Sequence, residues 1–287
     1  MGRWLLKYLL LPLAWLPLGV HYAASTLSAP LIHRVLRYRL KIVRGNLQRS
    51  FPDKNVAELR HIEHLYYRHL ADLLFEGIYN LRATPPLLLK HYRLVNRQIV
   101  DKYYEQGRSV VLMSSHYNNW EYMVSSLNFQ LRHHGVGVGK PLSDKGFGYE
   151  LNRRRTRYGT EVVDQTNVRD VMSYYHQHGI PVAYMMLSDQ SPSNPHRSYW
   201  TTFLHQDTAF LYGSEHFARK YDMPVIYYEV QKVRRGHYEV RFSLITDKPN
   251  SQPEGSITET YTKKLEQLIT SAPQYWLWSH RRWKLKK

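Results

Sequence analysis

The sequence predicts an α/β fold, in which a mostly parallel mixed sheet is flanked by helices and preceded by an N-terminal helical membrane anchor. From about residue 90 onward, short apolar runs alternate with segments of helical periodicity, which is typical of strands joined by crossover helices. Residues 8–32 contain no Lys, Arg, Asp or Glu, and a helix of about 20 apolar residues crosses a bilayer. We therefore expect an anchor with a basic flank over residues 1–44 and one α/β domain over residues 45–287.

The N-terminal apolar segment is interrupted by Pro12, Pro17, His21 and Pro30. A kinked span, a re-entrant hairpin and an interfacial helix are all compatible with this pattern. Five basic residues between positions 34 and 44 outnumber the two before position 8, so the positive-inside rule predicts a cytoplasmic domain. A cleaved signal peptide is the alternative, but "HYAAST" is a poor cleavage pattern and the positive charge downstream disfavours export.

The composition narrows the class of partner. The 287 residues carry a formal charge of +17, from 40 Lys and Arg against 23 Asp and Glu. Such a field attracts nucleic acid, anionic lipid headgroups or an acidic protein. The 24 tyrosines and 7 tryptophans suit a surface that is apolar at one end and wet at the other, such as a membrane interface. The lack of cysteine excludes disulfides and thiolate metal sites.

The elements follow from periodicity and from the residues that break it. Residues 45–80 are expected to form helices that break at residues 51–53, and the second of them begins near Asn55. After a connection at residues 84–86, the expected strands are RLVNRQIV, SVVLMSS, VGVGK, TEVV, IPVAYMMLSDQ, MPVIYYEVQKV and HYEVRFSLI, the last two joined as a hairpin by RRG. The expected helices are DKYYEQG, NNWEYMVSSLNFQLRHH, KGFGYELNRRRTRYG, NVRDVMSYYHQHG, DTAFLYGSEHFARKYD and SITETYTKKLEQLITSAP.

Three polar segments follow expected strands: SSHYNNWE, GKPLSDK and SDQSPSNPHR. In open α/β sheets, ligands bind beyond the carboxyl ends of the strands. The three segments are therefore expected to form one site.

The first of these segments contains His116 and Glu121, five residues apart. On one continuous helix their side chains would point about 140° apart. They meet only if His116 lies in the strand-to-helix turn and Glu121 in the first helical turn, with Asn118 or Asn119 as N-cap. The carboxylate would then accept a hydrogen bond from one imidazole nitrogen and leave the other basic. No G-x-S-x-G motif supplies an enzyme nucleophile, so the pair would activate a hydroxyl of the substrate.

Several motifs of the chain carry a family resemblance. "GRSVVLMSSHYNNWEY" and the ending "APQYWLWSHRRWK" resemble two signatures of the late lipid A biosynthesis acyltransferases, the lauroyl/myristoyl transferase family of the lysophospholipid acyltransferase-like superfamily. Three further segments, "TTFLHQDTAFLYGSEHFARK", "RRRTRYG" and "SDQSP", are similar to other stretches of that family. In "GKPLSDK", Lys140 stands where the family carries Arg. The resemblance covers nearly the whole chain.

The resemblance implies a general base, His116, with Glu121 as its partner. It implies transfer of a fatty acyl group from an acyl-carrier-protein thioester to a hydroxyl of a lipid A precursor, at the cytoplasmic face of the inner membrane. No cofactor, metal or nucleic acid is implied. The basic runs "RRRTR" and "RRWKLKK" would then dock the acidic carrier protein or anionic headgroups. The residues expected to bind substrate are Asn119, Lys140, Arg155, Asp189 and Arg197.

Other functions are compatible with the same sequence. An O-acyltransferase that acts on an aminolipid or a lysoglycerophospholipid would use the same base, although the H-x4-D and Glu-Gly-Thr patterns of glycerolipid enzymes are absent from the sequence. A thioesterase side activity would replace the acceptor with water. In a different class, the basic and aromatic content would suit a non-catalytic, membrane-tethered binder of anionic lipid or RNA.

Overall fold

The computed structural model describes residues 2–287, except for the side chain of Arg197. Its centre is a seven-stranded sheet in the order β1-β9-β8-β2-β5-β3-β4, in which only the β8–β9 pair is antiparallel. This confirms the predicted mostly parallel, mixed sheet. The strands are β1 (Tyr92–Leu94), β2 (Val110–Ser114), β3 (His134–Gly139), β4 (Glu161–Asp164), β5 (Val182–Leu187), β8 (Val225–Arg234) and β9 (His237–Thr246).

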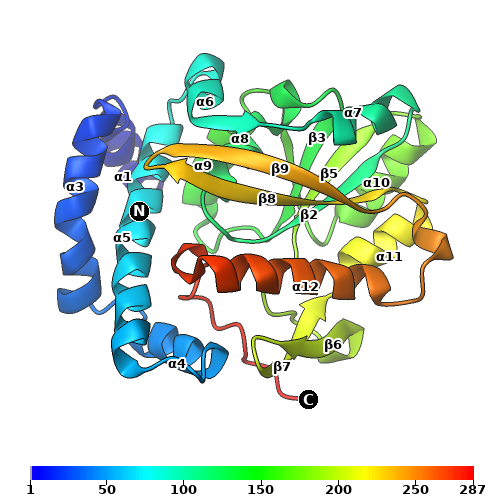
Figure 1. The fold of residues 1–287 in the computed structure, drawn as a ribbon. Coiled ribbons are helices and arrows are strands. Elements are labelled where there is room, and N and C mark those ends of the chain that lie inside the picture. Colours follow the sequence, from blue (N-terminus) through cyan, green and yellow to red (C-terminus); the bar gives the residue numbers. More distant parts are fainter. Residues whose placement is uncertain (1) are drawn as a thin grey trace.

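Helices cover both faces of the sheet (Figure 1). On β2, Val111 and Met113 face one apolar core, whereas Val110 and Leu112 face the other. This alternation follows the two-residue period of a strand and explains why the strand reads as a continuous apolar run. The first core includes residues of α4 (Leu40–Ser50), α5 (Val56–Asn80), α10 (Val168–Gln177), α11 (Gly213–Lys220) and α12 (Ser256–Ser271). The second includes residues of α6 (Pro85–His91), α7 (Gln98–Glu105) and α8 (Trp120–Gln130).

The break and restart predicted between the first long helices is confirmed. Helix α4 ends at Ser50 and α5 begins at Val56. Asn55 accepts hydrogen bonds from the backbone of Ala57 and Glu58, and the Glu58 carboxylate accepts from the Asn55 backbone. This reciprocal capping box satisfies two of the N–H groups that a helix start leaves unpaired.

Two predicted elements are wrong. The strand expected over residues 93–100 is only β1, because α7 already begins at Gln98. The helix expected over residues 207–222 is a strand, β7 (Gln206–Leu211), followed by α11. β7 pairs with β6 (Ser198–Phe203), and the two-residue turn between them has positive φ at Leu204 and His205. Such turns usually contain Gly or Asn, so the sequence gives no hairpin signal here.

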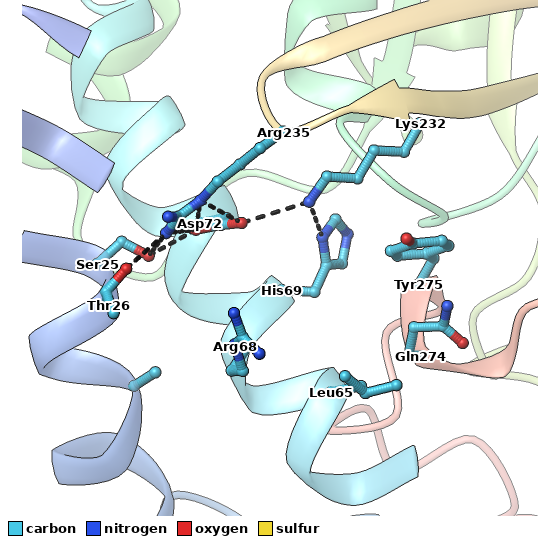
Figure 2. A pocket seen from close by; sticks show the side chains of 11 residues that line it. Ser25, Thr26, Leu65, Arg68, His69, Asp72, Lys232, Arg235, Gln274 and Tyr275 are labelled. Atoms are coloured by element: carbon cyan, nitrogen blue, oxygen red, sulfur yellow. Dashed lines mark hydrogen bonds and ion pairs between the residues drawn. The ribbon is translucent and has the colours of Figure 1, made fainter. Parts of the chain in front are cut away.

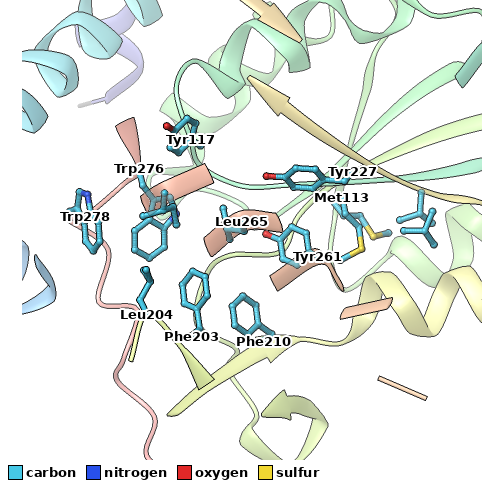
Figure 3. Packing of buried hydrophobic residues seen from close by; sticks show 14 of the residues in the cluster. Met113, Tyr117, Phe203, Leu204, Phe210, Tyr227, Tyr261, Leu265, Trp276 and Trp278 are labelled. Atoms are coloured by element: carbon cyan, nitrogen blue, oxygen red, sulfur yellow. The ribbon is translucent and has the colours of Figure 1, made fainter. Parts of the chain in front are cut away.

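The β6–β7 hairpin and α12 enclose an aromatic part of the first core (Figure 3). Tyr227 and Met113 of the sheet face Tyr261 and Leu265 of α12. The chain then leaves α12 through a 3₁₀ turn, Pro273–Tyr275, and buries Trp276 and Trp278. This packing carries the C-terminal segment to the end of β2.

The N-terminal residues form two helical arms on α5 (Figure 1). The first contains α1 (Gly2–Leu5), a π-helical turn (Leu6–Leu10) and α2 (Leu11–Leu13), and the second contains α3 (Leu18–Pro30) and a π-helical turn (Leu31–Val35). Within residues 2–287, no single helix is long and apolar enough to cross a membrane, but the two arms, bent by 117°, meet that test together. The boundary expected after residue 44 falls inside α4.

The second arm turns its apolar side outward. His21, Ser25 and Ala29 of α3 are buried against α5, whereas a stripe at helical spacing is exposed, formed by Val20, Leu27, Leu31 and Val35.

Candidate active site

The site begins where two neighbouring parallel strands end together. Ser114, the last residue of β2, lies opposite Leu187, the last residue of β5. His116 follows the end of β2 by two residues, and Asp189 follows the end of β5 by two residues. The pairing of the two strands therefore brings these side chains into contact. The turn after β2 is held in place by Asn118, which has a φ of 54° and donates to the Val230 backbone. Asn tolerates this left-handed conformation better than most residues.

Asp189 holds the imidazole of His116. The Asp189 Oδ1 lies 2.7 Å from His116 Nδ1, and Oδ2 accepts from the His116 backbone N–H at 3.0 Å. Trp276 Nε1 donates to the same Oδ2 at 2.9 Å. Asp189 is 3% exposed, whereas the His116 side chain is 16% exposed. Burial alone would raise the pKa of Asp189, but the positive charge that His116 carries when protonated and these three hydrogen bonds lower it below its usual value.

These contacts assign the tautomer of His116. An ionised carboxylate only accepts hydrogen bonds, so Nδ1 carries the proton and Nε2 keeps its lone pair. Gln190 donates its side-chain amide to Nε2 at 3.1 Å. The edge of Trp120 packs against the ring, with the centroids 5.0 Å apart. His116 therefore presents a basic nitrogen that is covered by an amide, which an incoming hydroxyl could replace.

The predicted pairing of His116 with Glu121 is wrong. In the described part of the chain, no hydrogen bond joins these two side chains. Glu121 instead binds Arg155 through two hydrogen bonds, Nε–Oε2 at 2.8 Å and Nη2–Oε1 at 2.5 Å, and also accepts from Trp120 Nε1. Glu121 does lie in the first turn of α8, as expected. The pairing fails because Asp189, which follows the neighbouring strand β5, already binds Nδ1 of His116. The prediction that Asp189 binds substrate is corrected in the same way, because its oxygens are engaged by the protein.

The other predicted site residues differ in exposure. Asn119 is the N-cap of α8: its side chain accepts from the Tyr122 backbone and donates to the buried Glu76 at 2.7 Å. This confirms the predicted capping and gives Asn119 a structural role, while contact with substrate stays a prediction. Lys140 is exposed directly after β3. Arg197 ends the 3₁₀ turn Pro195–Arg197, and its side chain lies outside the described residues.

Several side chains of the basic runs RRRTR and RRWKLKK make contacts within the protein. Arg157 donates to backbone carbonyls at the end of α5, including those of Asn80 and Leu81. Arg282 is 2% exposed and lies over the ring of Phe210 at 4.4 Å. These two side chains are therefore not available for docking, unlike the exposed Arg153.

Three residues near His116 are not among the predicted site residues: Gln190, Trp276 and His280. His280 Nε2 accepts from the Ser191 backbone at 3.2 Å, and burial lowers the pKa of His280 to about 4. Gln190 follows Asp189 directly, so it belongs to the polar segment after β5 that the sequence already assigns to the site. Trp276 and His280 reach the site only because the chain returns from α12, which a local sequence pattern does not reveal.

An apolar groove of about 750 Å³ leads away from this site. Its polar end is lined by Trp120, Glu121, Arg155 and His280, and Trp120 connects it to His116. Most of the apolar lining comes from one side of α5, from the residue that follows it and from the N-terminal arms: Leu10, Ile32, Leu70, Leu73, Leu74, Phe75, Gly77, Ile78 and Leu81. A groove of this size and lining suits a small apolar ligand or chain with one polar end.

Comparison with known proteins gives the family. The chain is 21% identical over 289 residues to a lipid A biosynthesis lauroyltransferase of Escherichia coli (strain K12), an alignment that covers 96% of this chain and 92% of the relative. A family model described as bacterial lipid A biosynthesis acyltransferase matches residues 1–285. Because this match spans nearly the whole sequence, the chain belongs to the bacterial lipid A biosynthesis acyltransferases and is a lipid acyltransferase.

Proposed function

We propose that the enzyme moves a fatty acyl chain from an acyl-carrier-protein thioester to a hydroxyl of a lipid A precursor, with His116 as general base. The observation that carries this proposal is the position of His116: Asp189 orients its ring, and Trp120 joins it to the polar end of an apolar groove. A base at the end of an acyl-sized groove is what transfer of a fatty chain to an alcohol requires.

The proton balance needs only this histidine. Nε2 takes the proton of the acceptor hydroxyl as its oxygen attacks the thioester carbonyl. The tetrahedral intermediate then collapses, the C–S bond breaks, and the imidazolium returns the proton to the leaving thiolate. Such general-base catalysis contributes about 10²- to 10⁴-fold. Asp189 stabilises the transient imidazolium, because its carboxylate lies 2.7 Å from Nδ1.

The oxyanion and the substrate phosphates need donors as well. We assign the Gln190 amide, which already donates to Nε2, to the oxyanion that forms on the thioester carbonyl. Arg155 would face the acceptor at the polar end of the groove, with Glu121 holding its planar group in place. The exposed Lys140 after β3 and the exposed Arg153 are suited to anionic groups of the acceptor or of the acidic carrier protein.

The N-terminal arms would hold the enzyme at the inner membrane, with the α/β domain on its cytoplasmic face. This part of the proposal is supported by the exposed apolar stripe on the second arm and by the basic residues that follow it. An interfacial helix buries such a stripe among the acyl chains while Lys and Arg meet anionic headgroups.

Purified enzyme supplied with an acyl-carrier-protein thioester and a lipid A precursor tests the reaction. Mass spectrometry should show one additional acyl ester on the acceptor, and His116→Ala should lose this product while circular dichroism shows an intact fold. Lipids of cells with and without the gene provide the second test, in which a secondary acyl chain of lipid A should be missing without it. An unchanged lipid A, with loss of an acylated aminolipid or glycerophospholipid instead, would reject the proposed acceptor.

A further inference from the structure

A second cavity, of about 300 Å³, lies apart from the catalytic groove, between α3, α5, the β8–β9 hairpin and the 3₁₀ turn before Trp276 (Figure 2). Its lining contains three cationic side chains, Arg68, Lys232 and Arg235, and one carboxylate, Asp72. Figure 2 shows Lys232 and Arg235 reaching from the hairpin toward α5, where both bind Asp72.

The Asp72 carboxylate is already fully engaged. It accepts from Arg235 through Nε and Nη2, from Ser25 Oγ at 2.7 Å and from Lys232 Nζ at 3.3 Å. Arg68, which is exposed at the rim, has no hydrogen bond or ion pair to any other residue of the described chain. One carboxylate thus faces three cations, and the cavity keeps an excess of positive charge that favours an anion.

A buried imidazole lies beside these cations. His69 lines the cavity, is 4% exposed, and burial together with Lys232 lowers the pKa of its imidazole to about 3, so the ring is neutral. Lys232 Nζ can only donate, so His69 Nδ1, 3.4 Å away, accepts and Nε2 carries the proton. This buried N–H has no hydrogen-bond acceptor within residues 2–287, and the ring packs in a T-shaped contact against Tyr275, with the centroids 4.8 Å apart.

The surroundings favour a lipid as the source of that anion. Ser25, Thr26 and Ala29 of α3 form one wall of the cavity, and the exposed apolar residues Leu27 and Leu31 lie on the same helical arm. If that stripe enters the acyl region of a bilayer, the cavity lies at the level of the headgroups. A lipid phosphate and a free phosphate both present tetrahedral oxygens that accept hydrogen bonds from Arg and Lys.

We propose that this cavity binds the phosphate group of an anionic lipid headgroup, at a site separate from the catalytic groove. The proposal rests on the membrane contact of α3 proposed above but not on the acyl-transfer chemistry. A lipid phosphate held here by Arg68, Lys232 and Arg235 would fix how the domain sits on the bilayer.

Binding of the full-length protein to phosphatidylcholine vesicles, with and without phosphatidic acid, tests the site. Arg68→Gln is the informative variant, because Arg68 has no internal partner whose loss would disturb the fold. Lys41→Gln is the matched control, since it removes one exposed positive charge from the basic flank outside the cavity. Each Lys or Arg near an anionic surface contributes about five-fold in binding, so Arg68→Gln should bind vesicles with phosphatidic acid at least about five-fold more weakly, and more weakly than Lys41→Gln.

Competition by soluble glycerol 3-phosphate distinguishes binding in a defined pocket from a general attraction between charged surfaces. It should compete with vesicle binding of the wild type and of Lys41→Gln, but not of Arg68→Gln. Equal losses in the two variants would overturn the proposal. Thermal protection by inorganic phosphate, without any preference for phosphatidic acid vesicles, would assign the cavity to a free anion and overturn the lipid source. Acyl transfer in detergent without anionic lipid should be unchanged in Arg68→Gln, so failure of this site is distinguishable from failure of the proposed reaction.

Discussion

Asp189 contacts His116 twice, with one carboxylate oxygen on the ring nitrogen Nδ1 and the other on the backbone N–H. The two contacts fix both the ring and the turn that carries it. Because Trp276 donates to the same carboxylate, the C-terminal segment is part of this arrangement. The orientation of His116 thus depends on three segments of the chain, which meet at the ends of β2 and β5.

Asp189→Asn should lower the kcat of acyl transfer by about 10²- to 10⁴-fold, because the amide favours the wrong imidazole tautomer and does not stabilise the imidazolium. KM for the acyl donor should change little, since Asp189 is buried. Asp170→Asn, an exposed carboxylate on α10, is the control and should retain activity. In a His116→Ala background, Asp189→Asn should have almost no further effect, because the two residues act as a unit. Additive losses would show that Asp189 acts independently of His116.

Substitutions of Glu121 and Arg155 should change KM, unlike Asp189→Asn, which should change kcat. Glu121→Gln and Arg155→Lys each remove part of the bidentate pair at the groove, so we expect KM for the acceptor to rise in both. A double-mutant cycle should give a coupling of about 0.5–3 kcal/mol, as is usual for contacting residues. The pH dependence of kcat/KM, which reports the free base, should stay that of the wild type in Glu121→Gln. A shift in the acidic limb of this pH profile would indicate that Glu121 does orient His116.

Local patterns predicted most of the sheet but not the pairing at its end. The apolar run at β2 and the capped helix after it follow from periodicity and from Asn119. Which carboxylate meets His116 depends on β5 lying next to β2, and strand order is not encoded in a local pattern. For the same reason Trp276 and His280, which return from α12, were missed. The β6–β7 turn was missed because Leu204 and His205 occupy a conformation that sequence rules reserve for Gly and Asn.

Gly77 offers a direct test of the groove. It lies in α5 and lines the groove, and an added Cβ would meet no atom within 4 Å. Gly77→Phe should therefore fit the backbone while filling part of the groove, so the enzyme should prefer shorter acyl chains in competition between thioesters of different length. Gly77→Ala is the control: it should keep the chain-length preference and stabilise the fold by about 0.4–1 kcal/mol. An unchanged preference in Gly77→Phe would show that the acyl chain lies elsewhere.

Acid should destabilise the fold through the protonation of buried imidazoles. Burial and Lys232 lower the pKa of His69 to about 3, although Asp72 opposes this shift, whereas an unfolded histidine titrates near about 6.5. Between these values the unfolded chain binds one more proton, so stability is retained above about pH 6.5 and falls by up to about 1.4 kcal/mol per pH unit below it. His280 acts in the same direction, while the raised pKa of Glu76 acts in the opposite one.

Urea unfolding between pH 7 and 5 measures this slope. His69→Gln keeps an acceptor for Lys232 but does not titrate. The stability of this variant should therefore fall less steeply with decreasing pH than that of the wild type, by up to about 1.4 kcal/mol per pH unit. His61→Gln, at an exposed position of the same helix, should leave the slope unchanged. If His69→Gln and the wild type lose stability in parallel, then His69 is protonated in the folded state. The cavity beside it would then carry one more positive charge, and the assignment of a neutral ring would be wrong.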